Sequence, residues 1–335
     1  EAFDVALEAY RHLLRHYNEF SPYHDAALVG SLQTQYRKIN STYPPKTSEI
    51  RRLSNELDTF FKSHPLRDDN LSLYLTHVQL EANGLKNTEK AKRMLQEAIA
   101  MPPLSVRSKA MCKIQLGDLY HLEDEVWEAT LLYSQVEKDF PNDTIGQNAK
   151  YKNAKLAFYL HEFEWAKAQL DVLRAATSKL IANDAMNLSL IISDNESEDS
   201  INLPLAYYAK ADYLIENREY EKALSYLDSI SLLSASHQLE DDILYRKAEI
   251  AYKTQQYTLA DQLLKQLTTQ FPYEINTDDA LYLRALINER YLDDPLTAMD
   301  LYQQLLKEHP DSLFSAEARQ RYRILRNNNL KPSFN

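Results

Sequence analysis

The chain has 335 residues, carries a formal net charge of −11 and contains only 4 glycines and 1 cysteine. Because a single compact core stops growing near ~250–300 residues, this length indicates two domains or one elongated repeat array. Few glycines argue against hairpin-rich sheets and phosphate-binding loops, which need positive φ angles. The acidic balance argues against a broad nucleic-acid surface, and a single cysteine excludes an internal disulfide.

The N-terminal segment has the pattern of a helix that packs on a preceding one. Phe3, Ala6 and Tyr10 have the spacing expected for the second helix of a pair. We therefore expect the first helix of this pair, and any targeting segment, to be missing from the numbered chain. Helical patterns follow over residues 25–39 and 48–61 and predict one further helix pair.

The clearest motif runs from Leu116-Gly117 to Pro141 and contains the small residue Ala129 and the aromatic residue Tyr133. Small side chains at Gly117 and Ala129 would allow two helices to approach closely, and larger neighbours would fill the remaining space. Pro141 would end the second helix, because proline has no N–H donor and clashes with the preceding turn. The motif therefore predicts two antiparallel helices joined by a short turn.

The same frame of small, aromatic and closing residues recurs along the chain. In chain order, its further members are Ala91, Leu95, Ala98 and Pro103; Ala154, Phe163, Ala166 and Leu170; Ala211, Tyr220, Ala223 and Leu227; Ala248, Tyr257, Ala260 and Pro272; and Ala298, Tyr302, Leu305 and Pro310. One helix pair cannot bury its apolar stripe alone, so stability must come from stacking neighbouring pairs. The expected fold class is all-α, an α-α superhelix of stacked antiparallel helix pairs.

The main irregularity lies between residues 179 and 204. Residues 179–192 predict one extra amphipathic helix, and the acidic run 193–200 predicts an exposed loop. We therefore divide the chain into N-terminal helical repeats over residues 1–178, the irregular segment 179–204, and C-terminal repeats with a capping helix over 205–335. A longer loop between two ordinary repeats is the alternative interpretation of this segment.

The recurring motif resembles the tetratricopeptide repeat (TPR) family over residues 87–141 and 205–326. The closing sequences Phe140-Pro141, Phe271-Pro272 and His309-Pro310-Asp311-Ser312 are similar to those of the bacterial envelope branch. That branch includes BamD-like outer-membrane assembly lipoproteins and the periplasmic coordinator of the Tol–Pal system. The resemblance implies a scaffold in the periplasm or associated with the outer membrane. The sole cysteine, Cys112, stands inside a predicted helix and does not fit a lipid attachment site.

The TPR resemblance also implies a concave groove lined by the first helix of each unit, at its fifth, ninth and twelfth positions. Those positions give a predominantly aromatic and acidic set of partner-binding residues: Tyr151, Phe158, Tyr208, Asp212, Tyr245, Glu249, Tyr252 and Tyr282. Tyrosine offers a rigid contact area with a polar tip, and acidic neighbours favour basic or N-terminal segments. The alternative is that these tyrosines fill gaps between helices.

The sequence carries no glycine-rich phosphate loop and no nucleophile elbow. We therefore predict a non-enzymatic scaffold that binds a polypeptide partner, with no cofactor, no metal, no nucleic acid and no transmembrane segment. A bacterial cell-envelope assembly or secretion complex is the context that the resemblance favours. A cytoplasmic regulatory or sensor domain, and the helical platform of a larger cell-wall enzyme, remain the alternatives.

Overall fold

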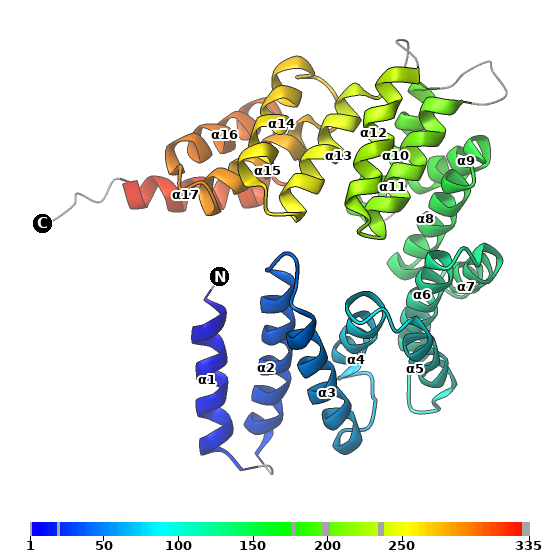
Figure 1. The fold of residues 1–335 in the computed structure, drawn as a ribbon, viewed down its shortest axis with the longest axis vertical. Coiled ribbons are helices and arrows are strands. Elements are labelled where there is room, and N and C mark those ends of the chain that lie inside the picture. The colour runs from blue at the N-terminus through cyan, green and yellow to red at the C-terminus, as the bar shows by residue number, and fades with distance from the viewer. Residues whose placement is uncertain (1, 19–20, 176–177, 196–201, 234–237, 330–335) are drawn as a thin grey trace, which may run out of the picture. The chain divides into compact units, whose positions relative to one another are not determined.

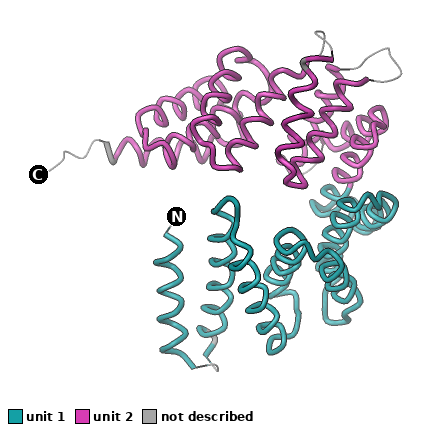
Figure 2. The backbone as a smooth tube through the Cα atoms, in the orientation of Figure 1, with its two compact units in different colours: residues 1–149 teal, residues 150–335 magenta. Residues whose placement is uncertain are grey.

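A computed structural model of the chain describes residues 2–18, 21–175, 178–195, 202–233 and 238–329. Over this part of the chain the structure consists of 17 α-helices and one π-helical turn, with no β-strand (Figure 1). The chain divides into two compact units, residues 1–149 and 150–335 (Figure 2). The predicted boundaries at residues 178 and 204 stay a prediction.

Unit 1 contains helices that pack against their neighbours in chain order, α1 on α2, α2 on α3, α5 on α6 and α6 on α7. Its elements are α1 (Phe3–His16), α2 (Pro22–Asn40), α3 (Thr47–Ser63), α4 (Leu71–Gln79), the π-helical turn η1 (Leu80–Gly84), α5 (Thr88–Ala100), α6 (Val106–Leu122) and α7 (Val126–Asp139). The predicted helix pair over residues 22–65 is confirmed as α2 and α3.

Unit 2 repeats the same arrangement: α9 packs on α10, α11 on α12, α13 on α14, and α14 to α17 each on the next. Its helices are α8 (Thr144–Tyr159), α9 (Phe163–Leu173), α10 (Lys179–Asp194), α11 (Leu203–Glu216), α12 (Tyr220–Leu233), α13 (Glu240–Lys253), α14 (Tyr257–Gln270), α15 (Thr277–Arg290), α16 (Pro295–Glu308) and α17 (Ser315–Asn329). The extra helix predicted over residues 179–192 is therefore present, as α10. Most of the predicted acidic loop lies outside the described residues. The predicted fold class, all-α with stacked helix pairs, is confirmed.

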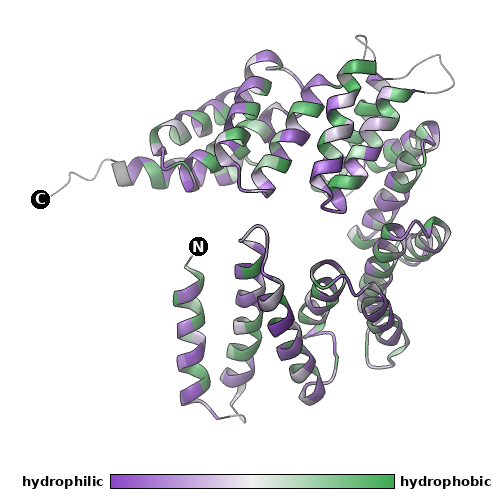
Figure 3. Cartoon of the chain, in the orientation of Figure 1, coloured by the Kyte–Doolittle hydropathy of each residue, from purple (hydrophilic) through white to green (hydrophobic). Residues whose placement is uncertain are grey.

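The helices carry both apolar and polar residues, as Figure 3 shows. The recurring small residues lie at the closest approaches: Ala129, Ala166, Ala223 and Ala260 are fully buried. At Gly117 a Cβ atom would come within 2.6 Å of the Tyr133 ring. This contact explains why the motif has glycine there, since any side chain would displace the ring.

The turns before α5, α7, α9, α12, α14 and α16 each contain a residue with left-handed backbone geometry, and none of these residues is glycine. They have φ angles of 53–64° and are Lys86, Asp124, His161, Arg218, Gln255 and Asp293. This geometry ends a helix by satisfying its last carbonyls, and it usually favours glycine. The scarcity of glycine therefore does not mean a scarcity of tight turns, because other residues adopt the left-handed conformation here.

The largest core cluster of unit 2 joins α8, α9, α10 and α11. Phe158, Leu170, Ile192 and Tyr208 are among its most deeply buried members. Since α10 packs on α9 and contributes Ile181, Leu188 and Ile191 to the same core, apolar packing holds it within the repeat stack. None of the helices in the described part of the chain combines the length and the apolarity of a membrane span.

Candidate functional site

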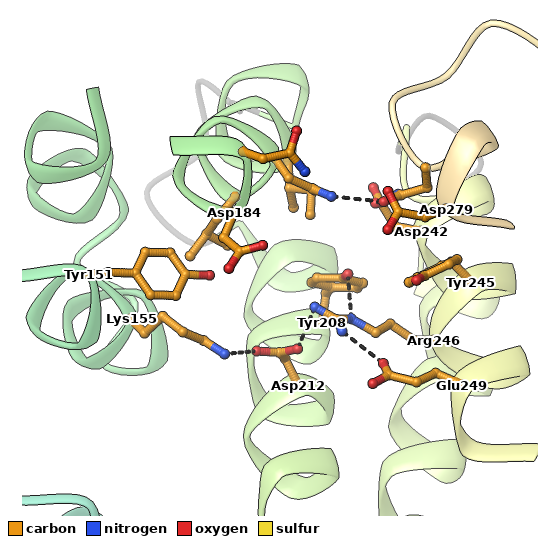
Figure 4. A pocket seen from close by; sticks show the side chains of 15 residues that line it. Tyr151, Lys155, Asp184, Tyr208, Asp212, Asp242, Tyr245, Arg246, Glu249 and Asp279 are labelled. Atoms are coloured by element: carbon orange, nitrogen blue, oxygen red, sulfur yellow. Dashed lines mark hydrogen bonds and ion pairs between the residues drawn. The ribbon is translucent and has the colours of Figure 1, made fainter. Parts of the chain in front are cut away.

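A cavity of about 190 Å³ lies within unit 2 (Figure 4). Its walls come from α8, α10, α11, α13 and the start of α15. Four of these are stacked helices of successive repeats, and α10 is the extra helix beside them. The cavity is therefore a product of the repeat stack and of its one irregularity.

Three tyrosines line the cavity, and each occupies the fifth position of its repeat. Tyr151 projects from α8, Tyr208 from α11 and Tyr245 from α13. In Figure 4 the Tyr151 ring points inward from one side and Tyr245 lies on the opposite side. Burial raises the pKa of Tyr151 to about 12, so its hydroxyl stays protonated at neutral pH. These rings provide the rigid aromatic surface that the sequence predicts.

In one half of the cavity, which we call the compensated half, the acidic residues Asp212 and Glu249 form ion pairs with basic residues of the same chain. Asp212 accepts an ion pair from Arg246 Nη2 at 2.8 Å and another from Lys155 Nζ at 3.0 Å. Arg246 also pairs with Glu249 at 2.9 Å through Nη1, and its Nε donates to the Tyr208 hydroxyl at 3.2 Å. Burial opposes ionisation of Asp212, but Arg246 and Lys155 hold the pKa of this carboxyl well below its usual range. The predicted acidic residues Asp212 and Glu249 are thus already neutralised within the protein.

The other half of the cavity carries three further carboxylates, Asp184 from α10, Asp242 from α13 and Asp279 from α15. Asn276 Nδ2 donates to Asp242 Oδ1 at 2.8 Å, and Asn187 Nδ2 donates to Asn276 Oδ1 at the same distance. Among the described residues, no lysine or arginine lies within ion-pair distance of these three carboxylates. This half therefore carries three carboxyls without a direct ion pair, and Lys155 and Arg246 act on it only from a longer distance.

The pKa values of these three carboxyls are raised, whereas the pKa of Asp212 is lowered. Burial, with the nearby charges of Asp278 and Asp184, raises the pKa of Asp279 to about 7. Burial and Asp241 raise the pKa of Asp242 well above its ordinary value. Burial also raises the pKa of Asp184, against the opposing effect of Lys155 and Arg246. A cation entering this half would lower all three pKa values and would be bound more tightly at higher pH.

Five of the eight predicted partner-binding residues line this cavity: Tyr151, Tyr208, Asp212, Tyr245 and Glu249. The other three lie elsewhere. Phe158 is fully buried in the core. Tyr252 packs against Tyr257 and Tyr291, and Tyr282 stacks on Phe314 with ring centroids 4.3 Å apart. The part that any of the eight plays in binding stays a prediction.

Asp184, Asp242 and Asp279 were not among the residues predicted from the sequence. A signal was present for two of them, because Asp242 and Asp279 each stand three residues before a fifth-position tyrosine. Residues three apart share a helix face, so this spacing places both carboxyls next to the tyrosine positions. Asp184 has no such signal, since α10 lies outside the repeat frame.

Unit 1 contains a second group of titratable residues, in which His77 and Glu81 are buried and Asp58 and Lys90 are partly exposed. Ligand atoms of Asp58, His77 and Glu81 lie within 4.8 Å of one another, a spacing that a metal ion could use. However, Lys90 Nζ contacts Glu81 Oε1 at 2.8 Å and Asp58 Oδ2 at 3.0 Å, so the lysine ammonium already provides the counter-charge. Ser54 donates a hydrogen bond to Glu81 and contacts His77 Nε2. We interpret this group as a cluster in which Lys90 of the same chain bridges the two carboxylates, while burial lowers the pKa of His77.

Comparison with known proteins identifies the repeats. Residues 242–272 and 279–312 match the family model of the tetratricopeptide repeat. These segments cover most of α13 to α16, so this part of the chain consists of tetratricopeptide repeats. No protein of curated function matches the sequence.

Solved structures of repeat proteins are similar at low identity. A tetratricopeptide repeat protein from Parabacteroides merdae aligns with a TM-score of 0.37 and 13% identity, over 89% of this chain and 98% of that one. Pseudomonas aeruginosa pilF aligns with a TM-score of 0.31 and 17% identity, over 78% and 99%. The TPR domain of P58(IPK) aligns with a TM-score of 0.32 and 12% identity, over 99% and 100%. These values are too low to bear on partners or cellular context.

Proposed function

We propose that the chain is a non-enzymatic scaffold that binds a segment of a partner polypeptide at the cavity of unit 2. The observation that carries this proposal is the convergence of Tyr151, Tyr208 and Tyr245 on one cavity from three repeats. Tyrosine provides a large contact area at low entropic cost, and its hydroxyl can bond to a peptide backbone. Tetratricopeptide repeats are protein-interaction folds, which agrees with a protein partner.

The chemistry of the cavity wall also favours binding over catalysis. Its residues are tyrosine, asparagine, leucine, isoleucine, acids, Lys155 and Arg246, and the described residues that line it include no serine, cysteine or histidine. Both basic residues are committed to Asp212. This wall therefore offers aromatic and charged contact surfaces and no paired nucleophile and base.

The proposal is tested by selecting peptides from a display library of random 12-residue sequences against the full chain. The dissociation constants of the enriched peptides are then measured by fluorescence anisotropy. Tyr245→Ala removes an aromatic wall, so we expect about tenfold weaker binding or more, which is typical of a contact residue at the centre of an interface. Tyr273→Ala is the matched control, because Tyr273 is 95% exposed on a turn outside the cavity.

Thermal unfolding of both variants shows whether Tyr245→Ala acts through folding, and Tyr245→Leu provides a second variant that retains apolar volume. Peptides that bind all three variants as tightly as the unmodified chain would place recognition elsewhere and overturn the proposal. A library that yields no specific binder would overturn it as well.

We also propose a bacterial cell-envelope setting, in the periplasm or at the outer membrane. This part of the proposal is supported by the closing sequences at Pro141, Pro272 and Pro310 alone. Fractionation of the native cells, followed by detection with an antibody against this chain, tests it. Recovery of the protein in the cytoplasmic fraction only would contradict the envelope setting and leave the binding proposal intact.

A further inference from the structure

The aspartate half of the cavity, which contains Asp184, Asp242 and Asp279, has a ligand preference that follows from its charge. Five carboxylates line the cavity, at Asp184, Asp212, Asp242, Glu249 and Asp279, against the two cations Lys155 and Arg246. Both cations are held by Asp212, and Arg246 also by Glu249. The carboxyls without an ion pair are therefore Asp184, Asp242 and Asp279, which come from three different helices and whose raised pKa values mean that they ionise most fully when a cation enters.

A second observation on the same wall points to a hydrogen-bond donor. Asn187 Oδ1 is buried and accepts no hydrogen bond from the described residues, while its amide nitrogen is committed to Asn276. A buried carbonyl oxygen without a donor is costly, and an incoming N–H group would satisfy it. The Asn187, Asn276 and Asp242 side chains form a hydrogen-bonded chain, so this acceptor is held in a fixed orientation.

We infer that the aspartate half of the cavity receives the cationic head of a lysine or arginine side chain from the partner polypeptide. Asp184, Asp242 and Asp279 provide the counter-charge, Asn187 Oδ1 accepts an N–H, and Tyr151 and Tyr245 contact the aliphatic stem. Long basic side chains combine an apolar stem with a charged end, which matches a cavity that has aromatic walls and an acidic end. The inference rests on the proposed function and specifies the residue type that anchors the partner.

The size of the cavity agrees with one side chain. Its volume of about 190 Å³ is below the ~300–1,000 Å³ of sites that enclose drug-sized ligands. The neighbouring compensated half would also reject an acidic side chain, because Lys155 and Arg246 are already bound to Asp212. The cavity thus discriminates by charge as well as by shape.

The test uses small probes, so it does not depend on knowing the partner. N-acetyl-lysine methylamide and N-acetyl-arginine methylamide are titrated into the full chain labelled with ¹³C in its tyrosine rings. N-acetyl-norleucine methylamide is the uncharged control, and glycinamide tests a free amino terminus. We expect saturable shifts of the Tyr151 and Tyr245 ring signals with the two basic probes, and at least tenfold weaker binding of the norleucine probe.

Charge removal provides the second arm. Asp184→Asn together with Asp279→Asn should weaken the basic probes at least tenfold and leave the norleucine probe unchanged. Asp311→Asn, on an exposed turn, is the control. Between pH 6 and pH 8 the affinity for the basic probes should rise at least about tenfold, since a proton leaves Asp279 on binding and the raised pKa values of Asp242 and Asp184 allow these carboxyls to add to the rise. Lys155, Arg246 and the wall tyrosines keep their protonation states over this range, because their pKa values are raised.

The outcomes separate this inference from the proposed function. Equal binding of the norleucine probe, preference for glycinamide, or basic probes unaffected by the aspartate substitutions would each overturn the basic side-chain anchor. If the library peptides still depended on Tyr245 in those cases, the scaffold proposal would stand with an uncharged anchor. If binding depended neither on the aspartates nor on Tyr245, both the basic side-chain anchor and the scaffold proposal would be overturned.

Discussion

The two groups of charged residues described above differ in whether a cation of the same chain pairs with their carboxylates. In unit 1, Lys90 bridges Asp58 and Glu81, and Glu81 has only 3% of its side chain exposed. In unit 2, Asp184, Asp242 and Asp279 line a cavity, and no described lysine or arginine reaches them within ion-pair distance. The repeat scaffold therefore carries one group with a cation from the same chain and one whose carboxyls have no ion pair among the described residues.

Under the proposed function, this difference separates structural charges from binding charges. A buried carboxylate with a partner from the same chain contributes to holding helices in register, and breaking the pair is costly. A carboxylate that is desolvated without a partner lowers stability, and a fold retains it where a ligand recovers that cost. The sign of the stability change on neutralising each group is therefore diagnostic of its role.

The largest effect is expected from Lys90→Met in unit 1. This change leaves the buried Glu81 facing Asp58 without a cation, so we expect a loss of about 3 kcal/mol in the free energy of unfolding. Lys90 and Ser54 hold the pKa of Glu81 below its ordinary value of 4.5 despite burial, so the stability that this pairing provides is present above pH 4.5 and is lost as the pH falls further. Urea denaturation at pH 7 and pH 4 measures both. Lys46→Met, which breaks an exposed pair with Glu49, should change stability by less than about 0.5 kcal/mol.

Asp279→Asn in unit 2 should have a smaller effect with the opposite sign. The folded-state pKa of Asp279 is raised from 3.8 to about 7, so this carboxyl destabilises the fold increasingly as the pH rises from about 4 to 7. We expect the variant to be about 2 kcal/mol more stable than the unmodified chain at pH 8 and equally stable at pH 4. Urea denaturation across this range gives the comparison. A variant that is destabilised at pH 8 would show that Asp279 has a structural partner.

The smallest effect is expected from Ser54→Ala, which removes a buried donor to Glu81 while Lys90 remains. A loss of about 1 kcal/mol is typical of one such hydrogen bond. Combined with Lys90→Met, the two losses should be non-additive by about 0.5 kcal/mol or more, because both groups act on the same carboxylate. Strict additivity in urea denaturation would mean that the unit 1 group does not act as one network.

The sequence predicts the helix pairs well because their packing is local and repetitive. Gly117, Ala129 and Pro141 each have a physical role that depends only on spacing, and the same frame locates Tyr151, Tyr208 and Tyr245. Since each repeat supplies equivalent positions, residues far apart in the chain can be assigned to one surface from their places in the repeat alone.

The charge pairing could not be predicted in the same way. Asp212 is neutralised because Lys155 from α8 and Arg246 from α13 form ion pairs with it. The repeat frame gives the positions of these residues, but it does not predict which acidic side chain a long basic side chain will pair with. In unit 1 the i, i+4 pairs Ser54 with Asp58 and His77 with Glu81 were visible in the sequence. These two pairs meet at the π-helical turn that contains Glu81, and the hydrophobic periodicity of the sequence does not predict such a turn.

The left-handed turn residues determine where the chain could be shortened without loss of register. Arg218 and Gln255 have φ angles of 60° and 62° at equivalent points of successive helix pairs, separated by 37 residues. Excision of residues 219–255 would join α11 directly to α14 through one such turn. The new contact would still bring together two buried alanines, Ala211 from α11 and Ala260 from α14. The array is thus divisible into interchangeable modules, so gene duplication or deletion could alter the number of helix pairs without a new type of junction.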